Sequence, residues 1–298
     1  MNSNELKYIE LIKGRYPGLD ISKIEFNKTD GSYSDIAVVN NEEVFKFAKY
    51  DWSAVYLKNE ADVVRFIKDF ISLPLPDVEM IDQNVSRRRY IKGSPLYRSI
   101  LLKSGYRTQD TIASQIATFL KQLHSIPIKT VQHAEIGDSR MNLSHEDWMA
   151  ELEMVQRKIL PYCTGYVKEY LHQVIKPVMD DEKFFGFKPA LIHGDLTPNH
   201  ILFDQTSRRV SGIIGFGNAG LGDPSYDLGM LLDHLGEGFI KRMHKYYPIT
   251  PACLDRARFY AYISSFMWLR DVCDMISTRD FSRFQIPAKD RDIYPLGT

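Results

Sequence analysis

The chain has 298 residues, of which 44% are hydrophobic and 26% are charged, and 38 Lys and Arg residues balance 38 Asp and Glu residues. This is the composition of an ordinary globular protein, and the length is sufficient for two domains or for one large two-lobed unit with its own core. Neither the first 92 residues nor the rest of the chain has the large excess of basic residues that sequence-independent phosphate binding needs. A nucleic-acid partner is therefore not expected.

The cysteines and the apolar runs narrow the class of protein further. Cys163, Cys253 and Cys273 are too few and too scattered for a disulfide framework or a zinc site. The sequence begins without an apolar signal region, and no apolar run approaches the length that crosses a membrane. We expect a cytoplasmic monomer that has no membrane partner and acts on a small molecule.

The first hundred residues combine strand and helix patterns. In chain order, the apolar spacing predicts a helix over residues 6–12, strands over 21–26, 36–39 and 44–47, a helix over 55–70, and strands over 78–80 and 89–91. A polar, glycine-containing turn is expected at 27–35 and a hairpin turn at 40–42. Residues 93–95, Gly-Ser-Pro, are the best candidate for a linker between lobes.

After residue 105 the pattern is mainly helical. In chain order we expect helices over residues 112–123, 145–160 and 164–180, short strands at 190–192, 201–203 and 210–214, and helices over 225–245 and 252–275. The first two of these strands flank a polar loop, which makes this interval different from the helices on either side.

Two stretches carry the chemistry: LIHGDLTPNHILFD at residues 191–204 and GIIGFGNAGLGDPSYDLG at residues 212–229. Asp195 lies on the polar loop, where a carboxylate can accept the proton of a substrate hydroxyl. Its spacing to His200 matches the kinase catalytic-loop pattern H-x-D-x-x-x-x-N, with histidine at the asparagine position. Gly215 opens a Gly-Phe-Gly triplet at the position of the metal-binding D-F-G. Asp195 could also form a turn, and His200 could be a packed or solvated histidine.

The amino-terminal half supplies the complementary parts in the order that a kinase-like fold requires. Lys46 is a single cation inside the apolar run VFKF, where an unpaired lysine would be costly to bury. Glu60 lies on the next predicted helix and could hold Lys46 against phosphates, although a glutamate on a helix face is usually exposed. The small-residue turn at 27–35 could cover phosphates with its backbone N–H groups.

These residues identify a family. The chain resembles the aminoglycoside phosphotransferases, most closely the 2″-phosphotransferase group, in VFKFAK (44–49), YIKGSPL (90–96), FLKQLHSIPI (119–128) and the two stretches above. The resemblance implies an α+β, two-lobed, protein-kinase-like fold. It places a small β-rich nucleotide-binding lobe at 1–92 and a larger, mainly helical catalytic and substrate-binding lobe at 93–298, with a helical insertion at about 105–180. It also implies ATP or GTP with Mg²⁺, and an aminoglycoside antibiotic as the acceptor.

The resemblance also assigns roles to single residues. It makes Asp195 the catalytic base that orients the acceptor hydroxyl, His200 a metal ligand and Lys46 the phosphate clamp, with Glu60 as its partner. The other nucleotide-binding positions that it implies are Ser32, Tyr33 and Ser34 in the phosphate-covering loop, and Arg89 and Ile91 at the purine edge.

Two positions depart from the family pattern. The family has a metal-binding aspartate where this chain has Gly215, and the loss of one electrostatic stabiliser typically costs on the order of 10²–10³ in turnover. Arg88 stands where the family usually has an apolar or aromatic residue beside the purine. Its guanidinium could stack on the base or hydrogen-bond it, or the register of the strand could be one residue off.

A polycationic acceptor needs carboxylates around its amines. The candidates are Asp233 and Glu237 on the predicted helix at 225–245, Asp271 and Asp274 on the last helix, and Trp268, which could stack on a sugar ring or pack in the core. A solvated charged face explains such acidic pairs equally well. Asp223, Asp227 and His193 are expected to brace loops rather than to touch substrate.

Three functions remain open from the sequence. The first is transfer of the γ-phosphate of a nucleoside triphosphate to an aminoglycoside hydroxyl, at 2″, which would give antibiotic resistance with turnover reduced by Gly215. The second is a pseudokinase that binds nucleotide or drug without phosphate transfer. The third keeps the chemistry but changes the acceptor to a macrolide or to a metabolite such as homoserine, choline or methylthioribose.

Overall fold

The computed structural model describes residues 3–26 and 34–272. The chain divides into two compact units. The first comprises the residues up to Pro95 together with His200–Ala219, and the second comprises Leu96–Asn199 together with the residues from Gly220 onward. Within the described residues, no helix combines the length and the apolar character needed to span a membrane.

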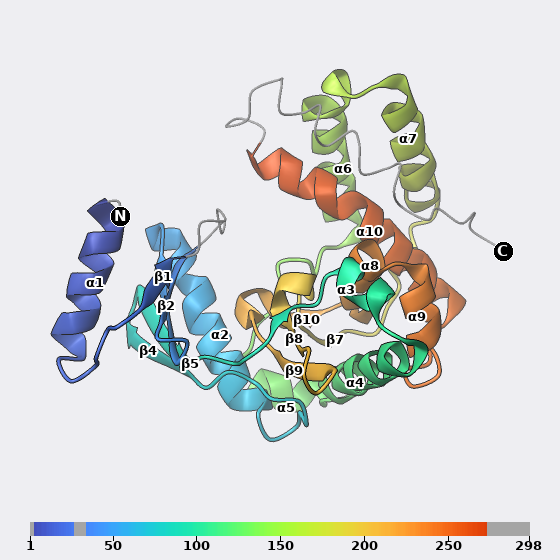
Figure 1. Ribbon diagram of the computed structural model, residues 1–298. Coiled ribbons are helices and arrows are strands. Elements are labelled where there is room, and N and C mark those ends of the chain that lie inside the picture. Colours follow the sequence, from blue (N-terminus) through green and yellow to red (C-terminus); the bar gives the residue numbers. More distant parts are fainter. Residues whose placement is uncertain (1–2, 27–33, 273–298) are drawn as a thin grey trace. The chain divides into compact units, whose positions relative to one another are not determined.

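The first unit is built on a five-stranded antiparallel sheet in the order β1-β2-β3-β5-β4 (Figure 1). Its strands are β1 (Ile24–Phe26), β2 (Ser34–Val39), β3 (Glu43–Ala48), β4 (Val78–Asp82) and β5 (Val85–Arg89). The expected hairpin turn between β2 and β3 is confirmed. Asn40 and Asn41 have φ values of 52° and 55°, which asparagine tolerates better than most residues.

Two helices cover opposite faces of this sheet (Figure 1). Helix α1 (Ser3–Arg15) packs Ile12 against the face that carries Phe45 and Phe47. Because side chains alternate along a strand, Lys46 points to the other face, where α2 (Ala54–Ile67) lies. The sheet thus separates an aromatic core from a face that carries charge.

A second, three-stranded sheet in the order β6-β8-β9 belongs to the same unit. It consists of β6 (Ser94–Pro95), β8 (Ile201–Asp204) and β9 (Arg209–Ile213), and a short 3₁₀ helix η4 (Phe216–Asn218) follows. The first unit ends at Pro95, at the linker expected at 93–95, but Ser94 and Pro95 are strand residues, because β6 pairs with β8. Gly93 permits this pairing, since a Cβ there would lie 2.5 Å from Ser211 Oγ.

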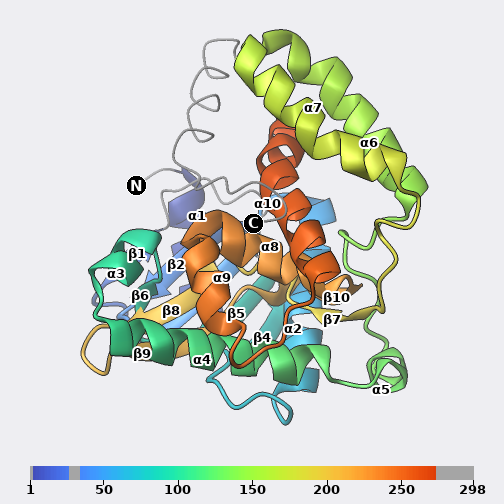
Figure 2. The ribbon, with the colours of Figure 1, turned by 90° about the vertical axis from the view of Figure 1, so that its right-hand side faces the viewer.

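The second unit is mainly helical. Its elements are α3 (Arg98–Lys103), α4 (Tyr106–His124), α5 (Ile128–His133), α6 (His145–Lys158), α7 (Gly165–Asp180), strands β7 (Ala190–Ile192) and β10 (Gly220–Gly222), α8 (Pro224–Leu235), α9 (Glu237–Met243) and α10 (Pro251–Val272). Strands β7 and β10 pair antiparallel, and α6 and α7 lie side by side (Figures 1 and 2). The fully buried Trp148 of α6 stacks on Phe185 and meets Phe259 of α10 edge to face.

Candidate active site

Lys46 and Glu60 form an ion pair inside the first unit. Lys46 Nζ lies 2.5 Å from Glu60 Oε2, and the Glu60 side chain is only 2% exposed. Lys46 points from β3 toward α2, and Glu60 belongs to the buried face of α2. The contact that the sequence suggested between a buried lysine and a helix glutamate is therefore present.

Glu60 also fixes the backbone at the Gly-Phe-Gly triplet. Its Oε1 accepts a hydrogen bond from the Gly215 N–H at 3.1 Å. Burial is the largest single influence on the pKa of Glu60 and opposes ionisation. The charge and hydrogen bond of Lys46, the charge of Arg88 and the Gly215 N–H together outweigh burial and hold this pKa below its ordinary value. Glu60 is therefore ionised at neutral pH.

Helix α2 holds the rest of this triplet through a residue that the sequence did not single out. Asn59 Nδ2 donates to the carbonyl oxygens of Gly217 at 3.0 Å and Ala219 at 2.8 Å. A Cβ at position 217 would lie 3.1 Å from the carbonyl oxygen of Tyr56, so glycine lets the helix approach closely. An amide side chain next to the predicted Glu60 was the only signal of this contact in the sequence.

The imidazole of His200 fills the space above Gly215. Gly215 has a φ of 85°, and a Cβ built on it would overlap the His200 ring. Glycine supplies no side-chain oxygen, whereas Mg²⁺ binds through oxygen ligands and usually through carboxylates. No group of three or more His, Cys, Asp or Glu side chains suited to a metal ion occurs within residues 3–26 and 34–272. The residues at 200 and 215 therefore do not fit the Mg²⁺ ion that the resemblance implied.

In the second unit, Asp227 of α8 holds the loop that carries Asp195. Its carboxylate accepts the N–H groups of His193 at 2.8 Å and Gly194 at 3.0 Å. His124 Nε2 lies 3.1 Å from the same carboxylate, while its Nδ1 lies 2.9 Å from the Tyr247 hydroxyl. The Asp227 carboxylate and the Tyr247 hydroxyl thus hold the two ring nitrogens of His124.

These contacts keep Asp227 charged although it is fully buried. Burial raises its pKa most strongly, but the His124 hydrogen bond, the electrostatic interactions with His124 and His193, and the His193 N–H reverse that effect and lower the pKa of Asp227 below its usual value. The predicted bracing role of Asp227 is confirmed. His193, which is fully buried, accepts the N–H of Asp195 on its Nδ1 at 3.2 Å, so its predicted loop-holding role is confirmed too.

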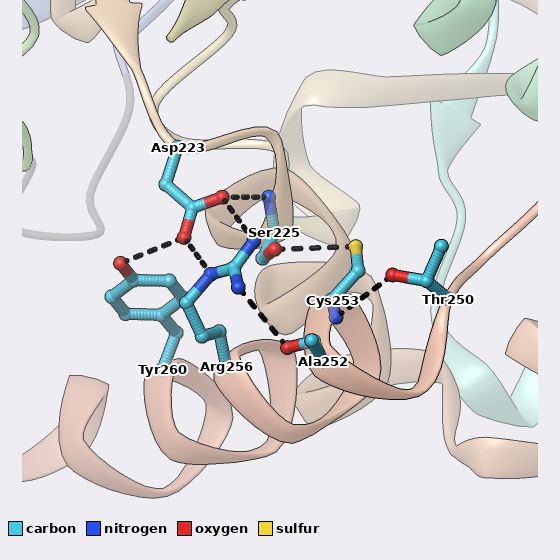
Figure 3. Close-up of polar contacts among 7 residues, drawn as sticks. All are labelled: Asp223, Ser225, Thr250, Ala252, Cys253, Arg256 and Tyr260. Carbon is cyan, nitrogen blue, oxygen red and sulfur yellow. Dashed lines mark hydrogen bonds and ion pairs between the residues drawn. The ribbon is translucent and has the colours of Figure 1, made fainter. Parts of the chain in front are cut away.

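Asp223 anchors the start of α8 to α10 (Figure 3). Its buried carboxylate accepts the Ser225 N–H at 2.9 Å, the Arg256 Nε–H at 2.6 Å and the Tyr260 hydroxyl at 3.1 Å. An N-cap bond and an ion pair thus meet on one side chain. This confirms the predicted bracing role of Asp223, and it orients the helix from which Asp227 reaches the Asp195 loop.

Two of the acidic candidates for acceptor binding, Asp233 and Glu237, lie near the end of α8 and at the start of α9. The expectation that Asp233 and Glu237 share one helix is wrong, because Gly236, with a φ of 86°, separates α8 from α9. Glu237 Oε1 lies 3.3 Å from Arg258 Nη2 and 3.4 Å from Lys241 Nζ, so its charge is compensated within the protein. Asp233 and Glu237 both line a cavity of about 30 Å³.

The remaining predicted site residues are distributed as follows. Ser34 is the first residue of β2, Arg89 is the exposed last residue of β5, and Ile91 follows that strand. Strand β5 therefore ends at the first residue of the interval predicted for it, 89–91. Trp268 and Asp271 belong to α10, whereas Ser32, Tyr33 and Asp274 lie outside the described residues.

Comparison with known proteins decides the family. A family model described as the Phosphotransferase enzyme family matches residues 30–260. The chain belongs to this family. The chain is 23% identical to the viomycin phosphotransferase of Streptomyces vinaceus over 216 residues, which cover 69% of this chain and 72% of that relative. It is 24% identical to an aminoglycoside 3′-phosphotransferase of Escherichia coli over 163 residues, which cover 53% of this chain and 56% of that relative.

Solved structures of such phosphotransferases share the fold. One is an aminoglycoside 2″-phosphotransferase of type IIIa in complex with GDP and kanamycin, with a TM-score of 0.84 at 23% identity, over 96% of this chain and 98% of that chain. Another is a type I macrolide 2′-phosphotransferase, with a TM-score of 0.73 at 19% identity over 99% of both chains. The chain of this phosphotransferase family member therefore has the α+β, protein-kinase-like fold that the resemblance implied.

Proposed function

We propose that this protein transfers the γ-phosphoryl group of ATP or GTP to a hydroxyl of an aminoglycoside antibiotic, at the 2″ position, and thereby gives resistance. The Lys46–Glu60 ion pair carries the proposal, because a lysine buried against a glutamate is the arrangement that holds nucleotide phosphates in kinase-like enzymes. Family membership and the names of the relatives support the same reaction.

Each proposed role follows from the chemistry of phosphoryl transfer, which depends on positioning and on charge stabilisation. Lys46 binds the phosphates and Glu60 keeps its ammonium in place. Asp195 accepts the hydrogen bond of the acceptor hydroxyl from a loop that Asp227 holds rigid. We assign nucleotide binding to residues 1–92, and catalysis and acceptor binding to residues 93–298. The proposal requires Lys46 and Asp195 to act on the same triphosphate.

Gly215 favours a second candidate function. A chain without the carboxylate at this position loses a stabiliser that is typically worth on the order of 10²–10³ in turnover. The protein would then bind nucleotide or drug and transfer phosphate slowly or not at all. Both candidates predict nucleotide binding, and they differ only in turnover.

A matrix of nucleotides and antibiotics tests the proposal. ATP and GTP are each combined with kanamycin, gentamicin, streptomycin and a macrolide, and phosphorylated product is detected by mass spectrometry. Phosphorylated aminoglycoside with either nucleotide supports the proposal, and a product with the macrolide alone assigns the other acceptor. Thermal stabilisation by nucleotide and drug without any product supports the second candidate, because a ligand that binds the folded state raises its stability.

A further inference from the structure

Arg88 is a buried cation that the proposed reaction leaves without a role. It lies on β5 opposite Val44, two residues along from the pair of Lys46 and Ser86, so Arg88 and Lys46 share the face of the sheet that α2 covers. Diagonal neighbours of this kind are about 7–8 Å apart, within reach of long side chains. The register also settles the question left by the sequence, because Arg88 itself, and not a neighbour, points inward.

The guanidinium of Arg88 is incompletely satisfied. Arg88 is 9% exposed, its Nη1 donates to the carbonyl oxygen of Arg89 at 3.2 Å, and its buried Nε has no hydrogen-bond partner. Leaving a buried charged donor unpaired is costly, and proteins rarely do so without a ligand or water at the site. The Nε–H is therefore available to an anion that enters this face of the sheet.

The charges on this face do not balance. Lys46 and Arg88 contribute two positive charges, Glu60 contributes one negative charge, and position 215 contributes none. An aspartate at position 215 would neutralise the excess positive charge of this face. A metal ion would then be needed to offset the negative charge of the phosphates. The absence of this aspartate, with the His200 imidazole in its place, leaves a net positive face that suits a polyanion directly.

We propose that Arg88 and Lys46 together bind the nucleotide phosphates and replace the charge of a divalent cation, so that this chain binds nucleotide in the absence of metal. The inference rests on the proposed function, because it concerns the same nucleotide. The guanidinium presents its Nε–H to a phosphate oxygen in a charge-assisted hydrogen bond, and the ammonium of Lys46, held in place by Glu60, binds a second oxygen.

Equilibrium binding of GTP and ATP, measured by titration calorimetry in EDTA and in Mg²⁺, tests the proposal. We expect the dissociation constant to change by less than about threefold when Mg²⁺ is removed. A change of this size is smaller than the free energy of one charge-assisted hydrogen bond. In EDTA, Arg88→Met should weaken binding by roughly 10- to 100-fold, and Arg88→Lys should restore part of the loss. Inorganic triphosphate should show the same dependence on Arg88.

Two controls separate the possible outcomes. Arg65→Met removes an exposed guanidinium from α2 and should leave nucleotide binding unchanged. Guanosine and adenosine, which have no phosphates, should bind the wild type and Arg88→Met equally. Equal losses for nucleoside and nucleotide would show that Arg88 contacts the base, and binding that requires Mg²⁺ would show that a metal is still needed. Either result overturns the inference and leaves the proposed function standing, whereas no nucleotide binding under any condition contradicts both.

Discussion

Gly215 and His200 form a coupled pair at the scale of single residues. The glycine has a φ of 85°, and the imidazole occupies the space where its Cβ would be. A side chain at position 215 must therefore adopt a left-handed backbone conformation and displace the histidine. The first requirement costs about 1 kcal/mol for an L-residue, and the second adds an overpacking cost of about 1–3 kcal/mol.

A double-mutant cycle measures this coupling. Gly215→Asp should lower the free energy of unfolding by about 2–4 kcal/mol, and it should lower it less when His200→Ala has already removed the ring. Measured by chemical denaturation, the double variant should be more stable, by about 1 kcal/mol or more, than the sum of the two single-variant effects predicts. Strictly additive effects would contradict the close packing of the two residues.

Glu60 predicts a dependence of stability on pH. Its pKa in the folded state lies below the ordinary value of 4.5, so the folded state keeps it ionised while the unfolded chain takes up a proton. The stability that it contributes is complete above pH 4.5 and is lost as the pH falls through the folded-state pKa. Glu60→Gln should flatten this acid limb and should cost about 3 kcal/mol at neutral pH, because it leaves Lys46 unpaired.

Urea denaturation from pH 7 down to about pH 3 checks this prediction, because the loss of stability begins below pH 4.5. Glu10→Gln on α1 is the control, since Glu10 is exposed and has no contact with Lys46. An unchanged acid limb in Glu60→Gln would show that the ion pair does not stabilise the folded state.

Some of these residues were predictable and others were not. Lys46 was recognisable because a single cation in an apolar strand requires a partner, and Glu60 lay on the following helix. The packing of His200 on Gly215 depends on a backbone angle and on side-chain placement, which residue spacing does not specify. The unpaired Nε of Arg88 likewise depends on which face of β5 is covered.

Helix α8 is the element that orients the loop of the second unit. Asp223 caps its first turn and binds Arg256 of α10 (Figure 3). Asp227, one turn later, accepts two N–H groups of the loop. The helix thus connects the packing of α10 to the backbone of His193 and Gly194. Its aspartates act through geometry, and neither needs to touch substrate.

Asp227→Asn should therefore destabilise the second unit. An amide cannot accept both loop N–H groups and the His124 proton, so a buried donor is left unsatisfied at a cost of about 2–4 kcal/mol. Asp255→Asn, at a half-exposed position on α10, is the matched control and should be neutral to within about 0.5 kcal/mol. Thermal denaturation of both variants gives the comparison, and a neutral Asp227→Asn would contradict the bracing role.

Elements were predicted well where apolar spacing was regular and less well where charge or glycine interrupted it. The helix at 112–123 became α4 because one uninterrupted apolar stripe faces the core. Strand β5 begins earlier than predicted because its run of three arginines does not resemble a strand, although ion pairs and burial accommodate two of them. The predicted helical stretch at 225–245 divides at Gly236, whose positive φ ends α8.

At the scale of the whole molecule, the proposed reaction divides its tasks between two units. Phosphate binding is assigned to Lys46 and Glu60 of the first unit, and the acceptor hydroxyl is assigned to Asp195 of the second. Because the tasks depend on different residues, one can be removed without the other. In a protein that binds nucleotide for another purpose, no substitution would abolish phosphoryl transfer while leaving nucleotide binding intact.

The most direct measurement combines nucleotide affinity with γ-phosphoryl transfer to kanamycin, using radiolabelled ATP and GTP, for the wild type, Lys46→Met and Asp195→Asn. Lys46→Met should weaken nucleotide binding by roughly 10-fold or more and lose transfer, because it removes a charge-assisted phosphate contact. Asp195→Asn should bind nucleotide as the wild type does and lose transfer by at least about 10²-fold. Transfer that survives Asp195→Asn, or a Lys46→Met variant with unchanged nucleotide affinity, would contradict the proposal that both residues serve one phosphoryl transfer.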